Sequence, residues 1–335
     1  MKNILVTGST GFIGSHLLPT LHKQNCQIKA AIRQKSEFPA FLPIKAIQVG
    51  EIDDMTDWQE ALIGIDTVIH LAGRSHILHE TISNPEAAFI KVNTKGTINL
   101  VKQSLKAEVK HFIFISSIHA MAAERDDILN ENSSCYPDSP YGRSKLQAEQ
   151  ALINLAKDTN MTWTILRPTL VYGSGNPGNM ERLMKLIKRG LPLPFGAVKN
   201  RRSFVFVGNL VDAIITCLEH PNAANQIFLI SDNQVVSSPQ LIRLIAQQIQ
   251  QPCQLLFVPT SLLRFLGYLG DRIEYTIGKN FPFNTYNIDR LLGSLFVDSS
   301  YIQKTLHWQP PFSLEQGLAQ TIKPENSDQL SMKSL

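Results

Sequence analysis

A tyrosine and a lysine stand four residues apart in the segment DSPYGRSK, as Tyr141 and Lys145. On a helix, residues four apart lie on the same face, so the phenol and the ammonium would be neighbours. Such a pair could move protons, with the tyrosine as the acid or base and the lysine beside it. The spacing fits the start of an ordinary helix equally well, so the rest of the chain must decide between the two interpretations.

Three glycines, Gly8, Gly11 and Gly14, follow the first apolar run of the chain and lead into a helical segment. A dinucleotide site needs glycine there because the turn is tight, the backbone approaches a pyrophosphate, and the helix packs closely on the sheet. The N–H groups at the start of the helix would bind the phosphates. The position of these glycines at the first strand–helix junction therefore predicts a dinucleotide site.

Two charged residues bear on the choice of cofactor. The glycine spacing is GxxGxxG, and Arg33 ends the second strand, where an acidic residue would normally bind the ribose of NAD. An arginine there could accept a 2′-phosphate, which favours NADP(H); a solvated Arg33 is the alternative and leaves NAD(H) open. Glu51 ends the third strand, near where the amino group of an adenine would lie.

The elements that would position these residues alternate between strands and helices. Near-continuous apolar runs, typical of parallel strands covered on both faces, occur at 3–8, 28–33, 44–50, 66–73, 111–117 and 163–168. Residues 85–107 open at Pro85 and repeat apolar residues at helical spacing. This β-α-β-α order predicts a Rossmann-type α/β fold, a doubly wound parallel sheet with right-handed crossovers.

The pattern changes after residue 168. We expect residues 1–168 to form an NAD(P)-binding Rossmann domain, and residues 169–322 to form a smaller C-terminal substrate-binding lobe with some elements returning to the main sheet. The lobe would contain a loop at 171–180, strands at 203–207 and 226–231, and helices at 181–189 and 208–220. The polar segment 323–335 is expected to be a flexible tail.

Composition excludes several functional classes. With 43% hydrophobic and 18% charged residues among 335, the chain has the composition of a soluble globular protein. A net charge of +4 from dispersed basic residues argues against nucleic-acid binding. Four widely separated cysteines without Cys/His ligand spacing argue for reduced thiols and against a metal site. The N-terminus has no signal-peptide pattern, so we expect a cytoplasmic protein.

The most apolar window, 255–270, is interrupted by Pro259 and Arg264 and is too short to span a bilayer. We therefore expect no integral membrane segment. A buried strand and helix is the favoured interpretation of this window, and a patch at a membrane surface is the alternative.

Together these motifs resemble the extended short-chain dehydrogenase/reductase family, in its NAD(P)-dependent nucleotide-sugar epimerase and reductase branch. The resemblance covers roughly residues 2–320 and rests on motifs in the family's order, namely TGSTGFIG, VIHLAG, VNTKGT, FISS, YGRSK, LRPTLVYG, NRRSFVFVGNLVDA and LHWQPPFSLEQGL. Within this branch the chain is most similar to UDP-glucose 4-epimerases and to 4-keto reductases of UDP-N-acetyl-6-deoxyhexoses.

The resemblance implies a role for each catalytic candidate. Tyr141 would exchange a proton with the sugar oxygen, and Lys145 would bind the nicotinamide ribose and lower the pKa of Tyr141. Ser117 would hydrogen-bond the reacting oxygen, and Asn93 would have a more structural role. The residues expected to bind the cofactor are Gly8, Thr10, Gly11, Phe12, Ile13, Gly14, Arg33, Glu51, Ile52, Leu71, Ala72, Gly73, Tyr141 and Lys145.

For the substrate, the resemblance implies that Arg202 and Arg290 bind a diphosphate and that Asn179 contacts a phosphate, in addition to Ser117 at the sugar. The chain departs from many relatives at SSIHAMA, which lacks their Tyr and Gly. His119 in this segment could touch the substrate, or it could line the pocket as a polar residue. The segment also lacks the Asp-Glu pair of the 4,6-dehydratases, which argues against a dehydratase.

The predicted reaction is hydride transfer at C4 of a UDP-sugar with NADP(H) or NAD(H). The favoured interpretation is a 4-keto reductase of a UDP-N-acetyl-6-deoxyhexose in surface polysaccharide synthesis, because Arg33 suggests an exchanging NADP(H). The first alternative is a UDP-glucose or UDP-N-acetylglucosamine 4-epimerase with tightly bound NAD. A reductase of a non-nucleotide ketone and a non-catalytic dinucleotide-sensing protein are further alternatives. The resemblance also implies a homodimer.

Overall fold

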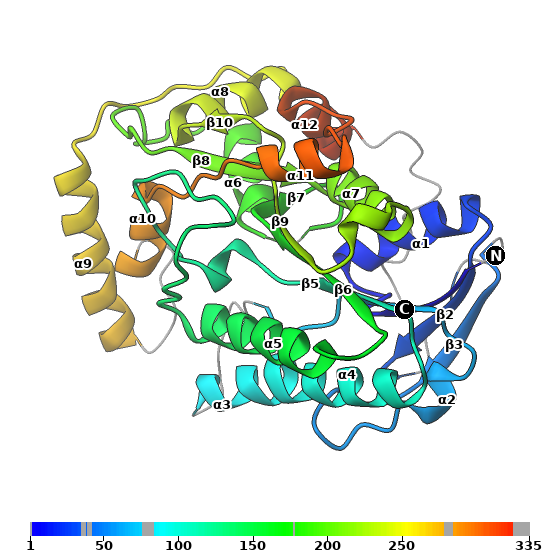
Figure 1. The fold of residues 1–335 in the computed structure, drawn as a ribbon. Coiled ribbons are helices and arrows are strands. Elements are labelled where there is room, and N and C mark those ends of the chain that lie inside the picture. The colour runs from blue at the N-terminus through cyan, green and yellow to red at the C-terminus, as the bar shows by residue number, and fades with distance from the viewer. Residues whose placement is uncertain are drawn as a thin grey trace.

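A sheet of seven parallel strands forms the centre of the protein (Figure 1). The computed structural model describes residues 2–34, 38, 42–75, 84–176, 178–277 and 284–323. The strand order is β3-β2-β1-β4-β5-β6-β9, which reverses direction between β1 and β4. The strands are β1 (Asn3–Thr7), β2 (Gln27–Ile32), β3 (Ile44–Gln48), β4 (Thr67–His70), β5 (His111–Ile115), β6 (Thr162–Pro168) and β9 (Gln226–Ile230). The predicted Rossmann-type doubly wound sheet is confirmed.

Helices cover both faces of this sheet because its strands are apolar on both sides. Along β1, Ile4 and Val6 join one buried cluster, whereas Leu5 between them joins the other. The first cluster includes residues of α1 (Phe12–Lys23), α7 (Val207–Glu219) and α11 (Ser300–Leu306). The second includes residues of α2 (Gln59–Leu62), α4 (Thr97–Lys106) and α5 (Pro140–Ala156).

The predicted helix at 85–107 is interrupted by a wider turn. It begins as α3 (Pro85–Phe89), continues as the π-helical segment η1 (Ile90–Gly96), and ends as α4. A Cβ on Gly96 would lie 2.7 Å from Cγ2 of Ile52, so the glycine lets this segment approach the loop after β3. Single π-helical turns are frequent at functional sites, and this one carries Asn93.

A smaller sheet, β10-β8-β7, lies in the part of the chain after residue 168. It consists of β7 (Leu170–Tyr172), β8 (Arg202–Phe206) and β10 (Val235–Val236), and it packs with α6 (Asn179–Lys188), α8 (Ser238–Ile249) and α12 (Leu314–Ile322) around a third cluster. β9 lies between these elements in sequence but pairs with β6 in the main sheet. A boundary between two domains at residue 168 stays a prediction, and the expected tail lies outside the described residues from residue 324 onward.

The apolar window at 255–270 does not form a buried strand and helix, so the favoured interpretation is wrong. Leu255 makes an isolated bridge with Leu193, and the rest of the window belongs mainly to α9 (Thr260–Ile277), which packs against α10 (Thr285–Leu292). Phe265 is 55% exposed, and other large apolar side chains of α9 also face outward. In Figure 1, α9 forms the edge of the molecule farthest from β2 and β3. Within the described residues no helix is long and apolar enough to cross a membrane.

Candidate active site

The Tyr141–Lys145 pair lies on the first two turns of α5, where the sequence predicts it. Ser139 caps this helix by accepting a hydrogen bond from the Gly142 N–H at 3.1 Å, and Pro140 is its first residue. A Cβ on Gly142 would lie 2.1 Å from the carbonyl oxygen of His119. The glycine therefore lets α5 begin directly against the segment that follows Ser117.

The phenol of Tyr141 and the hydroxyl of Ser117 share a hydrogen bond. Burial raises the pKa of Tyr141, and the bond with Ser117 lowers it. Two rings hold the phenol ring edge-on, with centroid distances of 5.9 Å for Phe89 and 6.0 Å for His119. The structure thus brings Ser117, Tyr141 and His119 together; the role of His119 beyond this aromatic contact stays open.

Lys145 is buried one turn along α5. Its Nζ donates to the carbonyl of Ile115 at 2.9 Å and lies 4.6 Å from the centre of the Phe114 ring. Burial lowers the pKa of Lys145 to about 8, while the negative charge of Glu149 raises it. An ammonium has three N–H donors, so this bond leaves Lys145 able to bind another acceptor in the same place.

Asn93 joins three elements around this lysine. Its Oδ1 accepts from the Arg74 N–H at 2.7 Å, and its Nδ2 donates to the Arg74 carbonyl and to Ser144 Oγ, both at 3.0 Å. A Cβ on Gly73 would lie 3.2 Å from Asn93 Oδ1 and 3.3 Å from Lys145 Nζ. Asn93 therefore fixes the end of the β4 loop beside Lys145, in agreement with the structural role that the resemblance implies.

A buried ion pair, which the sequence analysis did not predict, links α5 to β6. Arg167 at the end of β6 donates to Glu149 of α5 through Nε at 3.0 Å and through Nη2 at 2.5 Å. The two side chains are only 5% and 1% exposed. Ser116, next to Ser117, also donates to Glu149. The available signal was that Glu149 lies four residues after Lys145 and therefore on the same helical face.

The glycine loop fits a dinucleotide because side chains there would collide with backbone. Gly8 has φ +67°, and a Cβ on it would lie 2.7 Å from the Ala72 backbone nitrogen. A Cβ on Gly14 would lie 2.4 Å from the Gly8 carbonyl oxygen. Gly11 precedes α1 and offers no side chain to cap it, so the first N–H groups of this helix can bind a phosphate.

The other predicted cofactor residues lie around this loop at the carboxyl ends of the strands. Thr10 lies in the turn before α1, and Phe12 and Ile13 begin this helix. Leu71, Ala72 and Gly73 directly follow β4, which is paired with β1. Carboxyl ends of parallel strands next to the reversal in strand order are where open α/β sheets bind ligands. The residues present at this loop fit an NAD-type dinucleotide.

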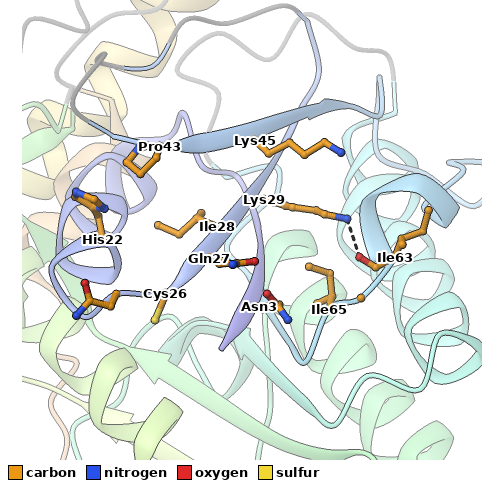
Figure 2. A pocket seen from close by; sticks show the side chains of 12 residues that line it. Asn3, His22, Cys26, Gln27, Ile28, Lys29, Pro43, Lys45, Ile63 and Ile65 are labelled. Atoms are coloured by element: carbon orange, nitrogen blue, oxygen red, sulfur yellow. Dashed lines mark hydrogen bonds between the residues drawn. The ribbon is translucent and has the colours of Figure 1, made fainter. Parts of the chain in front are cut away.

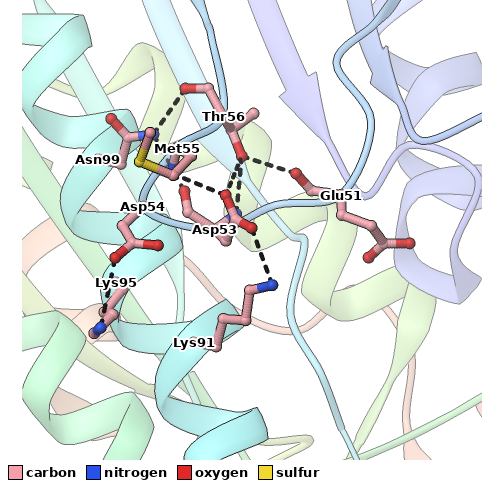
Figure 3. A network of polar contacts seen from close by, with 8 residues as sticks. All are labelled: Glu51, Asp53, Asp54, Met55, Thr56, Lys91, Lys95 and Asn99. Atoms are coloured by element: carbon pink, nitrogen blue, oxygen red, sulfur yellow. Dashed lines mark hydrogen bonds and ion pairs between the residues drawn. The ribbon is translucent and has the colours of Figure 1, made fainter.

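The expected adenine end lies at the loop after β3. The guanidinium of Arg33 forms an exposed ion pair with Glu51 at 3.6 Å. Figure 3 shows how the rest of this loop is held. Thr56 Oγ1 donates to the Glu51 carbonyl at 2.8 Å, and Asn99 of α4 donates to the Thr56 carbonyl at 2.8 Å. Ile52 lies inside this fixed loop, packed under Gly96.

Two of the predicted phosphate ligands lie together in the smaller lobe. Arg202 Nη1 donates to the backbone carbonyl of Arg290. Burial and the charge of Arg290 lower the pKa of Arg202 to about 10, and Glu124 raises it. Burial and then the charges of Asp289 and Asp138 raise the pKa of Glu124, while the charge of Arg202 lowers it. Glu124 was not among the residues that the sequence predicted. Asn179 is the first residue of α6, and its side chain is not among those that the structure describes.

A surface hollow at the opposite edge of the sheet is not part of this site. Its lining residues include Asn3, Gln27 and Pro43, next to the starts of β1, β2 and β3, and Lys29 donates to the Ile63 carbonyl at 2.7 Å there (Figure 2). This is the amino-terminal edge, away from the glycine loop. The described residues also contain no group of three His, Cys, Asp or Glu that could hold a metal ion.

The close contact at Gly142 generates a first prediction. Gly142→Ala should push the start of α5 away from the His119 carbonyl and displace Tyr141 from Ser117. Overpacking of this kind costs about 1–3 kcal/mol in stability, and a shift of about 1 Å at a reacting group can lower turnover about 100-fold. Steady-state kinetics and thermal unfolding check this. Arg143→Ala, which removes a half-exposed ion pair with Glu86, is the control and should keep wild-type turnover; equal turnover in both variants would contradict the prediction.

The environment of Lys145 generates a second prediction, on pH. If its charged form is required, kcat/KM should fall as the pH rises through about 8. Glu149→Gln removes a negative charge that raises the pKa of Lys145, so this fall should move to lower pH. Glu86→Gln, on an exposed ion pair, should leave the profile unchanged. Circular dichroism must show that the Glu149 variant is folded; a folded variant with the wild-type profile would exclude this coupling.

Comparison with known proteins shows the family of the chain. The NAD dependent epimerase/dehydratase family matches residues 4–231. Among curated proteins, a UDP-glucose 4-epimerase of Vibrio cholerae is 39% identical over 96% of this chain and 95% of its own length. An N-acetyl-alpha-D-glucosaminyl-diphospho-ditrans,octacis-undecaprenol 4-epimerase of Escherichia coli O157:H7 is 29% identical over 96% of this chain and 95% of its own length.

A solved structure supports the fold. The UDP-glucose 4-epimerase of Thermotoga maritima with UDP-glucose has a TM-score of 0.74 at 24% identity and covers 96% of this chain and 97% of its own. The prediction of an epimerase or reductase type of enzyme with a nicotinamide cofactor is thus confirmed at the level of the family. The chain belongs to the NAD dependent epimerase/dehydratase family, in the extended short-chain dehydrogenase/reductase branch.

Proposed function

We propose that this enzyme is an NAD-dependent 4-epimerase of a UDP-sugar. The observation that carries the proposal is the cluster of Ser117, Tyr141 and Lys145 beside a glycine loop that fits a dinucleotide. The 39% identical relative is a UDP-glucose 4-epimerase, which favours epimerisation over the reduction of a 4-keto sugar. The reductase would use the same residues in one direction.

Tyr141 would exchange the proton of the C4 hydroxyl. As phenolate it accepts this proton when C4 becomes a ketone, and it returns the proton to the C4 oxygen after the sugar has turned its other face. NAD, when bound, supplies the acceptor and then the donor of the hydride at C4. Ser117 shares a hydrogen bond with Tyr141 and can orient the same sugar oxygen.

Lys145 would favour the phenolate and bind the cofactor ribose. Burial raises the pKa of the phenol, and a positive charge one helical turn along α5 would favour its ionised form. The bond to the Ile115 carbonyl fixes the ammonium, and Glu149 keeps it protonated to higher pH than burial alone allows. These contacts preorganise the proton-transfer group before the substrate binds.

We propose NAD rather than NADP as the cofactor. The guanidinium of Arg33, which favoured NADP on sequence grounds, is paired with Glu51 at 3.6 Å, and the negative charge of this carboxylate would disfavour a 2′-phosphate on Arg33. We also propose that the enzyme acts in the cytoplasm as a homodimer, with the helical segments 85–107 and α5 at the interface. Arg202, Arg290 and Asn179 are the proposed ligands of the UDP diphosphate.

A second candidate substrate is a sugar diphosphate carried on a polyprenol. The 29% identical relative is named for such a substrate. The observation that favours it in this chain is the exposed apolar face of α9, which packs on the helix that carries Arg290. The same diphosphate ligands and the same C4 chemistry would serve both substrates.

The central test is the phenol of Tyr141. Tyr141→Phe should lower turnover about 10²–10⁴-fold, the range expected for a positioned acid or base, while the protein still retains its nucleotide. Turnover is followed by conversion between the two C4 epimers of a UDP-hexose. Release and identification of the bound nucleotide tests the cofactor. Wild-type turnover in Tyr141→Phe would exclude Tyr141 as the acid or base. Loosely bound NADPH that is consumed during the reaction would indicate the reductase.

The arginines test the substrate class. Arg202→Ala should raise KM for a UDP-sugar about tenfold or more with little change in kcat, because the diphosphate is remote from C4. The neighbouring Arg201 is exposed, and its guanidinium stacks 4.0 Å from the Phe296 ring, so Arg201→Ala is the matched control and should keep the wild-type KM. An unchanged KM in Arg202→Ala would favour a ketone without a nucleotide.

A further inference from the structure

The outer face of α9 carries a continuous apolar stripe. Its residues occupy positions i, i+3, i+4, i+7 and i+11, which lie on one side of a helix. They are Leu262, Phe265, Leu266, Leu269 and Ile273, with exposed fractions of 46%, 55%, 43%, 41% and 37%. Leu256 and Phe257, which precede the helix, are 45% and 75% exposed. Contiguous exposed apolar surface of this kind marks an interaction site.

The inner face of α9 packs against the rest of the protein, mainly against α10. Leu263 is buried, and Gly267 lets the helix approach α10 so closely that a Cβ would lie 3.1 Å from Thr285 Cα. The acidic residues of α9 also point inward. Asp271 accepts from the Thr285 N–H at 3.0 Å, and Glu274 accepts from Asn284 Nδ2 at 3.0 Å. The helix therefore turns Leu263, Gly267 and its acidic residues to the protein and most of its large apolar residues outward.

The flank of the stripe is cationic and aromatic. The side chain of Arg264 is 67% exposed and forms an ion pair with Asp289 of α10 at 3.5 Å, and Arg272 is exposed with its guanidinium 5.2 Å from the Tyr268 ring. Tyr268 and Tyr275 are 49% and 89% exposed. Arginines and tyrosines beside an apolar stripe are the composition of a helix that lies in a membrane interface, with apolar side chains among the acyl chains and cations at anionic headgroups.

We propose that α9, with Leu256 and Phe257, docks this enzyme reversibly onto an anionic lipid membrane. Charge complementarity favours this partner, because Arg272 is exposed and Arg264 remains 67% exposed in its ion pair with Asp289, while both carboxylates of α9 are turned inward. On its inner side α9 packs against α10, which carries Arg290 of the proposed diphosphate site, and Arg202 donates to the Arg290 carbonyl. A docked enzyme would therefore face a membrane-borne sugar diphosphate, although the binding itself does not depend on the substrate.

Vesicle flotation with the full chain, without substrate, tests the docking. Wild-type protein should float with vesicles of phosphatidylglycerol and phosphatidylethanolamine, and much less with pure phosphatidylcholine or in about 0.5 M salt. Phe265→Ser with Leu269→Ser should lower binding about tenfold or more, and Arg264→Gln with Arg272→Gln should lower it severalfold. The matched control is Ile63→Ser with Ile128→Ser, which removes apolar residues that are 69% and 49% exposed elsewhere and should bind as wild type.

Turnover and oligomeric state separate membrane docking from misfolding of the variants and from dimerisation through the stripe. All these variants should keep wild-type turnover on a soluble UDP-sugar, which shows that they are folded and that the proposed chemistry is independent of docking. Wild-type protein that stays unbound with every vesicle would overturn the proposal, as would a Phe265/Leu269 variant that floats like wild type. A concentration-dependent dimer that the same variant abolishes would also overturn it, because a second copy would then cover the stripe.

Discussion

The buried ion pair between Glu149 and Arg167 is the interaction on which the site depends. It joins α5, which carries Tyr141 and Lys145, to the carboxyl end of β6, and it also binds Ser116 beside Ser117. Removing two charges from water is costly, and here the cost is offset by two guanidinium bonds and a hydroxyl bond in a dry environment. Loss of one partner would leave the other charged and buried, so helix and strand are held in one arrangement.

The buried ionisable groups of the site differ in how far and in which direction their pKa values shift, because each has different partners. His70, held between Thr7 and Thr97 hydroxyls, has its pKa lowered to about 3 by burial and then by the charge of Lys145, so it is a neutral structural residue. Lys145 has the charge of Glu149 nearby and remains titratable near pH 8. Burial raises the pKa of the Tyr141 phenol, and the hydrogen bond with Ser117 lowers it. The electrostatics of the site therefore follow from which partner each group has.

Some helices of the protein bury their apolar side chains against the sheet, and α9 exposes most of its own. α7 and α4 turn apolar residues to the sheet and are covered by it, whereas α9 turns glycines and acids to α10 and its large side chains outward. The inner face of α9 packs on α10, which carries Arg290, and Arg202 of the smaller lobe donates to the Arg290 carbonyl. Docking there would leave the central sheet and the Tyr141 cluster unaffected.

Local patterns in the sequence were sufficient for the strands, the glycine loop, and the Tyr141–Lys145 face of α5. These features depend on residues within one turn or one strand, where spacing determines geometry. Pairs that meet across the fold could not be read in this way. Arg167 reaches Glu149 from another element, and Arg33 meets Glu51. The apolar periodicity of α9 indicates a helix with one apolar side, but only the tertiary structure decides which side is covered, since that depends on what packs against it.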